Sequence, residues 1–242
     1  LFQLLMLDTR SIYRDKQLNI EDYFDGNTIN KSKYKRDLSI DRKLIGLEQM
    51  LWIKNNLNKK FKWSIIGQQV LMAQVYLPSI FANMDKKVLP DYLHKYLKIG
   101  GVKVPYNTDA WDGYPRERER LFKELKKANS VIVLTGDTHN SWLNNLYDEN
   151  NNFIGVEIGT PAISSPNTID TFGSLTDGIE KGFIKENKNV KWTEGKHKGY
   201  TLLKLTKDKS EVSFIYVNTV KSKVYEVIDS NKFSVKPNTP II

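Results

Sequence analysis

Short apolar runs separated by longer polar stretches organise this chain, and each run has the length of a β-strand. A brief continuous apolar run bounded by glycine or polar residues is typical of a strand buried on both faces of an α/β sheet. A pair of later runs flanks a polar turn and predicts a hairpin. The expected strands cover residues 2–7, 63–66, 131–134, 141–147, 153–158, 199–205 and 211–217, with 231–242 as an edge strand.

One clear helical pattern lies between the first two strands. Leucines, Met50 and Ile53 recur at helical spacing and predict a helix over residues 44–57. Trp52 lies close to that apolar face, so we expect it to pack in the core. Residues 11–39 are polar with no sustained period, which favours a long surface loop.

A second helix is predicted over residues 115–127. Pro115 suits its first turn, and the apolar residues that follow give it one apolar face. Its arginines alternate with glutamates, a pattern that is typical of a solvated face. Shorter helices are expected over 91–97 and 176–187.

Polar clusters follow three of the predicted strands directly. They are Asp8-Thr9-Arg10, Gly67-Gln68-Gln69 and Gly136-Asp137-Thr138-His139-Asn140. Open α/β sheets bind ligands at the carboxyl ends of their strands, so we expect the clusters to converge. Asp137 and His139 offer an oxygen and an imidazole nitrogen from one tight loop, which suits a metal ion. The alternative is an ordinary turn in which Asp137 caps the next element and His139 is packed.

Several other polar residues have two interpretations each. Arg10 either pairs with Asp8 at the sheet edge or directs its guanidinium at an anion. Gln69 or Gln68 either satisfies loop backbone or reaches a metal or substrate oxygen. The turn Trp111-Asp112-Gly113-Tyr114 is either the rim of a pocket or an aromatic cluster over a helix start. His94 is expected at the surface or packed, and His197 is expected to be packed, with a ligand role as its alternative.

Composition narrows the classes of function. The 242 residues carry a formal net charge of +9, but the excess is mostly lysine scattered along the chain. A nucleic-acid surface more often shows clustered basic residues with interleaved aromatics, so nucleic acid is not the expected main partner. The charge still favours anionic substrates. There is no cysteine, no apolar run long enough for a membrane span, and no phosphate-loop, dinucleotide or nucleophile-elbow motif.

An ordered series of short motifs then resembles a known family. The series covers roughly residues 4–205 and resembles the PhoD-like alkaline phosphatase and phosphodiesterase family of the calcineurin-like metallophosphoesterase superfamily. The motifs are Leu7-Asp8-Thr9-Arg10, the Gly46, Gln49 and Trp52 pattern, Ile66-Gly67-Gln68-Gln69-Val70-Leu71-Met72, Trp111-Asp112-Gly113-Tyr114, Leu134-Thr135-Gly136-Asp137-Thr138-His139, Gly155-Val156-Glu157, Ser164-Ser165-Pro166 and Gly199-Tyr200.

The resemblance implies an α/β fold that forms part of a four-layer α/β/β/α metallophosphoesterase sandwich. Residues 1–242 would be the carboxyl-terminal portion of one such domain. The implied activity is hydrolysis of small phosphate esters with calcium and iron, by a monomer that is periplasmic or secreted. The metal ligands would be Asp137, His139 and Gln69, with Asp137 and His139 as the catalytic pair. The substrate side would comprise Arg10, Trp111, Asp112, Tyr114 and Asn140.

One departure from the family pattern stands out. The first metal-binding motifs of the family precede the Asp-Thr-Arg segment and cannot be placed in this chain, which opens inside an apolar run at Leu1 without an initiator methionine. We therefore expect sequence upstream to supply them. The alternatives are a non-catalytic remnant that acts as a binding or structural module, and a basic nucleic-acid-binding protein.

Overall fold

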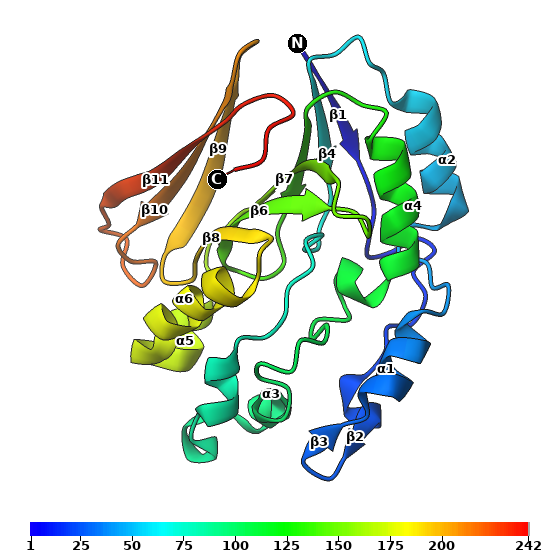
Figure 1. The fold of residues 1–242 in the computed structure, drawn as a ribbon. Helices are drawn as coiled ribbons and strands as arrows, with labels where there is room; N and C mark the ends of the chain where they lie inside the picture. The colour runs from blue at the N-terminus through cyan, green and yellow to red at the C-terminus, as the bar shows by residue number, and fades with distance from the viewer. Residues whose placement is uncertain (242) are drawn as a thin grey trace.

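A six-stranded sheet forms the centre of the molecule in the computed structural model, which describes residues 1–241 (Figure 1). Its strand order is β1-β4-β5-β7-β6-β8, and β1, β4, β5 and β7 run parallel. A second sheet has the order β11-β10-β9, and β2 and β3 form a small third sheet. The strands are β1 (Phe2–Met6), β2 (Phe24–Asp25), β3 (Thr28–Ile29), β4 (Trp63–Gly67), β5 (Val131–Thr135), β6 (Ser141–Tyr147), β7 (Phe153–Gly159), β8 (Val190–Glu194), β9 (Lys198–Leu205), β10 (Ser210–Val217) and β11 (Val227–Val235).

Helices cover one face of the large sheet, and the three-stranded sheet covers the other (Figure 1). The α-helices are α1 (Lys31–Leu38), α2 (Gly46–Asn56), α3 (His94–Leu97), α4 (Pro115–Leu125), α5 (Thr168–Phe172) and α6 (Thr176–Glu186). The 3₁₀ helices are η1 (Ile20–Tyr23), η2 (Ser79–Asn83), η3 (Lys86–Val88), η4 (Asp91–Leu93), η5 (Trp111–Gly113) and η6 (Gly173–Leu175). The α/β fold expected from the sequence is confirmed. Within residues 1–241, no helix combines the length and apolar character that a membrane crossing needs.

Alternation along the central strands divides the core between the two faces. Ile66 and Val133 face the helices and pack with Leu121 of α4. Trp63 and Ile132 occupy the alternate positions of the same two strands, and they face the smaller sheet. Because successive side chains of a strand point to opposite faces, a continuous apolar run is what a strand covered on both sides requires. Most of the predicted strands therefore follow directly from these runs, and the predicted hairpin is β9–β10. The edge strand predicted over 231–242 is wrong in its bounds, because β11 spans Val227–Val235, and Ile242 lies outside the described residues.

The predicted helix over 44–57 is present as α2, but the expected position of Trp52 is wrong. Trp52 is 43% exposed and Leu47 is 65% exposed, whereas Ile53 is fully buried. At 100° per residue, Gly46 and Ile53 lie on one narrow stripe, and Leu47 and Trp52 fall to either side of it. The buried stripe is therefore narrower than the run of apolar residues suggested.

The predicted surface loop over 11–39 is also wrong in part. The segment contains η1, the β2–β3 hairpin and α1. Tyr34 is fully buried and donates its hydroxyl to the Pro105 carbonyl at 2.6 Å, and Asn30 accepts from the Lys33 amide at the start of α1. Within α1 only Tyr34 and Leu38 are buried, four residues apart, so the apolar signal of this helix is one pair of residues in a polar segment.

The predicted solvated face of α4 is interrupted by two buried charges. Glu117 is 2% exposed, and its carboxylate accepts the backbone amides of Leu44, Ile45 and Gly46 at the start of α2. Arg118 is 6% exposed and pairs with Asp112. These charges connect α4 to its neighbours instead of facing water.

Candidate active site

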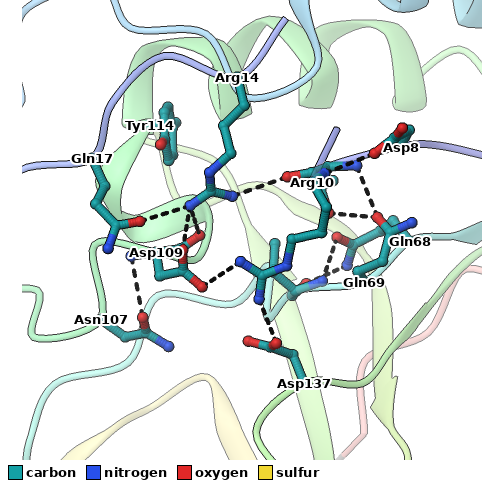
Figure 2. Close-up of polar contacts among 12 residues, drawn as sticks. Asp8, Arg10, Arg14, Gln17, Gln68, Gln69, Asn107, Asp109, Tyr114 and Asp137 are labelled. Carbon is teal, nitrogen blue, oxygen red and sulfur yellow. Dashed lines mark hydrogen bonds and ion pairs between the residues drawn. The ribbon is translucent and has the colours of Figure 1, made fainter. Parts of the chain in front are cut away.

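Three loops meet where β1, β4 and β5 end, as the sequence predicts. The parallel register aligns Met6 with Gly67 and Gly67 with Leu134, so the strands end side by side. Backbone hydrogen bonds continue past the strands, from Gln68 N to the Leu134 carbonyl at 3.0 Å and from Gly136 N to the Gln69 carbonyl at 3.1 Å. The three polar clusters therefore form one surface at this edge of the sheet (Figure 2).

Gln69 holds the loop that follows β1. Its amide oxygen accepts from the Thr9 amide at 2.8 Å and from the Thr9 hydroxyl at 2.6 Å. An amide oxygen has two lone pairs, so both are used. Gln68 is likewise satisfied, since its oxygen accepts from Val70 N at 3.1 Å and from Trp111 Nε1 at 3.2 Å. In this structure, the two glutamines satisfy loop groups, which was one of the two interpretations that the sequence left open.

Asp8 forms a tight turn at the end of β1. One of its carboxylate oxygens accepts from the amides of Arg10 and Ser11 at 2.8 Å each, and these bonds lower the pKa of Asp8. Gln49 of α2 bonds both the amide and the carbonyl of Asp8 at 2.8 Å. The Asp8 side chain therefore shapes the turn, and Arg10 is free to pair elsewhere.

The guanidinium of Arg10 bridges two carboxylates (Figure 2). It donates to Asp109 at 2.5 Å and to Asp137. Burial opposes its positive charge, but the bond to Asp109 and the charges of Asp137 and Asp109 raise the pKa of Arg10. Arg14 also binds Asp109 and lies over the Tyr114 ring at 5.3 Å from its centroid. Two arginines and two aspartates thus form one network beside the strand ends.

Two members of this network, Asp109 and Arg14, were missed by the reasoning from sequence. Asp109 lies 99 residues from Arg10 and 95 from Arg14 along the chain. A lone aspartate in a loop carries no periodic signal. The available signal was its place beside the Trp-Asp-Gly-Tyr turn, which the family resemblance had singled out.

The loop after β5 presents Asp137 and His139 in a strained conformation. Both residues have positive φ, 69° and 63°. Aspartate and histidine tolerate this region better than most residues, yet it still costs free energy. His139 Nδ1 lies 2.7 Å from the Pro166 carbonyl, which can only accept, so Nδ1 is the donor and Nε2 is the ring nitrogen left to bind another group. Asn140 donates its side-chain amide to the Thr168 hydroxyl at 2.7 Å, and this bond fixes the loop against α5.

The expected pocket rim at residues 111–114 needs correction. Trp111, Asp112 and Tyr114 are 0%, 4% and 1% exposed. Asp112 pairs with Arg118 at 2.6 Å and accepts from Val75 N at 3.0 Å, while burial raises the pKa of its carboxyl. These side chains form the packed support beneath the site, and none of them reaches the surface where a substrate would bind.

The described residues offer only part of a metal centre. Within residues 1–241, no three His, Asp or Glu side chains are grouped closely enough to hold a metal ion. Asp137 and His139 have suitable donor atoms, but the Asp137 carboxylate is bound to Arg10. His197 Nδ1 is bonded to Glu194 at 2.8 Å. By their chemistry, Asp137 and His139 could therefore supply two donor atoms to a metal ion, which is fewer than a complete site needs.

Comparison with known proteins gives consistent matches. The sequence model described as PhoD-like phosphatase matches residues 1–214. Alkaline phosphatase D of Bacillus subtilis (strain 168) is 32% identical over 209 residues, which cover 83% of this chain and 30% of that protein. A solved structure titled "Structure of PhoD" superposes with a TM-score of 0.68 at 25% identity and covers 98% of this chain and 40% of that one. The chain thus spans less than half the length of either relative.

Proposed function

The chain belongs to the PhoD-like phosphatase family, and we propose that it forms part of the active site of a metal-dependent hydrolase of small phosphate esters. The observation that carries this proposal is the meeting of Arg10, Asp137 and His139 at the ends of β1 and β5. A cation and metal-donor groups at one edge of a sheet are what phosphate binding and hydrolysis require. The likeness to alkaline phosphatase D supports the same reaction class.

Asp137 and His139 are the proposed metal ligands of this chain. The free Nε2 of His139 and the carboxylate of Asp137 are ordinary ligand atoms for a transition metal, and Gln69 is a further oxygen donor if its bonds to Thr9 open. The remaining donors would come from sequence outside these residues. Calcium and iron, as the family resemblance implies, would supply positive charge to the phosphate oxygens and activate a water for in-line attack.

Arg10 is the proposed phosphate-binding residue. Its planar guanidinium can bind two phosphate oxygens at once, and Asp109 holds it at the site. The ion pair with Asp137 occupies both groups in this structure. With Asp137 bound to a metal ion, the guanidinium would be free to bind phosphate oxygens while Asp109 still held it at the site. Asn140 keeps the loop after β5 in place through Thr168.

The test is Asp137→Ala in the intact protein, with metal content and hydrolysis of p-nitrophenyl phosphate measured together. We expect both to fall. Asp208→Ala, in an exposed turn of the smaller sheet, is the matched control and should change neither. If Asp137→Ala retains metal and activity, the assignment is wrong. If the unaltered protein holds no metal and hydrolyses no ester, the non-catalytic binding module is the better description.

The family resemblance also supports a periplasmic or secreted monomer. Cell fractionation with light scattering of the purified protein tests both expectations. A cytoplasmic location or a stable dimer would contradict them.

A further inference from the structure

A pocket of about 290 Å³ lies beside the loop that follows β5. Asp137 and Asn140 of that loop line one side of it, and Asn107 lines another. Its inner wall is aromatic and includes Phe81, Tyr96, Tyr106 and Phe172. Phe81 lies in η2, Tyr96 in α3 and Phe172 in α5, and Tyr106 lies in the segment before η5. None of them enters the proposed chemistry.

The aromatic wall is ordered by edge-to-face contacts. The rings of Phe81 and Phe172 lie 5.5 Å apart at 88°, and those of Tyr96 and Tyr106 lie 5.8 Å apart at 87°. Aromatic pairs favour such geometry, so the rings support one another without a ligand. Tyr96, Tyr106 and Phe172 keep part of their surface accessible. Burial raises the pKa of both tyrosine phenols, which therefore remain protonated donors.

Asp137 connects this pocket to Arg10. The guanidinium pairs with Asp137, which lines the pocket, and with Asp109, two residues beyond Asn107. Figure 2 shows Arg10 between Asp109 and Asp137, with Asn107 beside them. A phosphoryl group held by Arg10 would thus lie where the two lining segments meet. The group esterified to that phosphate would have the aromatic pocket directly beside it.

We propose that this aromatic pocket binds the leaving group of the substrate and selects phosphate esters of an aromatic or heteroaromatic alcohol. The inference rests on the proposed phosphoesterase function. The volume lies near the lower end of the roughly 300–1,000 Å³ that is usual for small-molecule sites, so it matches one ring system. Aromatic walls favour a planar ring over an alkyl chain of equal size, and the two phenols can donate to ring substituents.

The experiment measures binding without hydrolysis. Isothermal titration calorimetry of the intact protein compares phenylphosphonate with methylphosphonate, which share the phosphoryl group and carry a phenyl ring or a methyl group on phosphorus. We expect phenylphosphonate to bind about tenfold tighter, since aromatic contacts of this kind contribute on the order of a tenfold change in affinity. Equal affinities, or no binding of either compound, would overturn the pocket assignment.

Two variants locate the preference in the pocket. Phe172→Ala removes part of the wall, and Tyr92→Ala removes a lining side chain that is 65% exposed, so the second change cannot act by unfolding the core. Both should reduce the affinity for phenylphosphonate several-fold and leave that for methylphosphonate unchanged. Tyr225→Ala, 58% exposed and not part of this pocket, is the matched control. Equal loss of both ligands would show a structural role and contradict the proposal.

Hydrolysis assays separate the two proposals. If phenylphosphonate is preferred and no ester is hydrolysed, the pocket stands and the phosphoesterase function fails. If phenyl phosphate and glycerol phosphate are hydrolysed with equal kcat/KM and the phosphonates bind equally, the function stands and the pocket assignment fails.

Discussion

Arg10 and Asp137 form an ion pair across 127 residues of sequence and thereby join the loops that end β1 and β5. Each side chain is 34% exposed. Ion pairs near solvent contribute only roughly 0.2–1 kcal/mol to stability. The main effect of this pair is therefore to position the guanidinium of Arg10, which Asp109 also binds from the other side.

Arg10→Lys tests that position. Lysine keeps the charge but lacks the planar fork of donors, so it cannot stay bonded to Asp109 while it binds two phosphate oxygens. In the intact protein, we expect kcat/KM for p-nitrophenyl phosphate to fall roughly 100-fold, the usual effect of losing one donor to a developing anion. Urea unfolding should change by about 1 kcal/mol or less.

The control for Arg10→Lys is Arg36→Lys, at the exposed pair with Asp37. It should change neither activity nor stability. Unchanged kcat/KM in Arg10→Lys would remove Arg10 from the phosphate-binding role.

Asp112→Asn separates a supporting role from a substrate-binding one. Asp112 and Arg118 have side chains only 5% and 7% exposed, so the change leaves a buried guanidinium without its counter-charge. Loss of one partner of a buried pair costs about 3–5 kcal/mol. We expect the urea midpoint to drop accordingly, with KM unchanged in the folded fraction.

Arg120 and Asp41 provide a matched comparison on the same helix. Their side chains are 41% and 48% exposed, so Asp41→Asn should cost less than about 1 kcal/mol. Equal effects of Asp112→Asn and Asp41→Asn would contradict the structural assignment of Asp112.

The strands and the meeting of their polar ends could be predicted because both depend on local sequence. A buried parallel strand needs a continuous apolar run, and parallel neighbours place their ends at one edge. Asp137, Arg10 and Gln69 were therefore placed together from the sequence alone, and the structure brings them to the same edge. Whether Asp137 and His139 bind metal stays a prediction.

The errors arose where distant contacts decide the outcome. An aromatic turn such as Trp111-Asp112-Gly113-Tyr114 carries the same local signal whether it lines a pocket or packs in the core. Here Tyr114 donates its hydroxyl to the Asp15 carbonyl at 2.7 Å, a partner 99 residues away. The sequence around Glu117 is typical of a surface charge. Nothing near it reveals that its carboxylate accepts hydrogen bonds from three backbone amides more than 70 residues away.

Glu117→Gln tests how far α2 depends on α4. The carboxylate accepts from Ile45 N at 3.0 Å and from Gly46 N at 3.1 Å, and it also accepts the Leu44 amide. A glutamine would turn its NH₂ group toward at least one of these donors and leave it unpaired. We expect a loss of about 2 kcal/mol in urea unfolding, since bonds to a charged acceptor contribute roughly 1.5–3 kcal/mol.

Glu124→Gln on the same helix is the comparison for Glu117→Gln, because its partner Lys127 is largely exposed. It should cost less than about 1 kcal/mol. If the two variants unfold alike, the amide contacts of Glu117 contribute nothing that a surface pair does not.

The buried carboxyl of Glu157 should make the free energy of unfolding depend on pH. It lies in β7, fully buried, and accepts the amides of Met72 and Ala73 and the side chain of Asn144. Burial raises its pKa from 4.5 to about 7, although these donors favour the ionised form. Between these two values, the folded protein keeps a proton that the unfolded chain has already released. The contribution of Glu157 to stability is therefore greatest below the pKa that it has in the unfolded chain, and it is lost as the pH rises through 7.

The size of this effect follows from the shift, because each pKa unit corresponds to about 1.4 kcal/mol and the total is about 3 kcal/mol. Glu157→Gln removes the titration and is the reference. Urea unfolding of both proteins at intervals from pH 4 to 8 gives the free energy of unfolding of each. The wild-type value minus the variant value should fall by about 3 kcal/mol across this range. Parallel pH profiles would mean that Glu157 is already ionised in the folded protein, and that its three donors outweigh the cost of burying the charge.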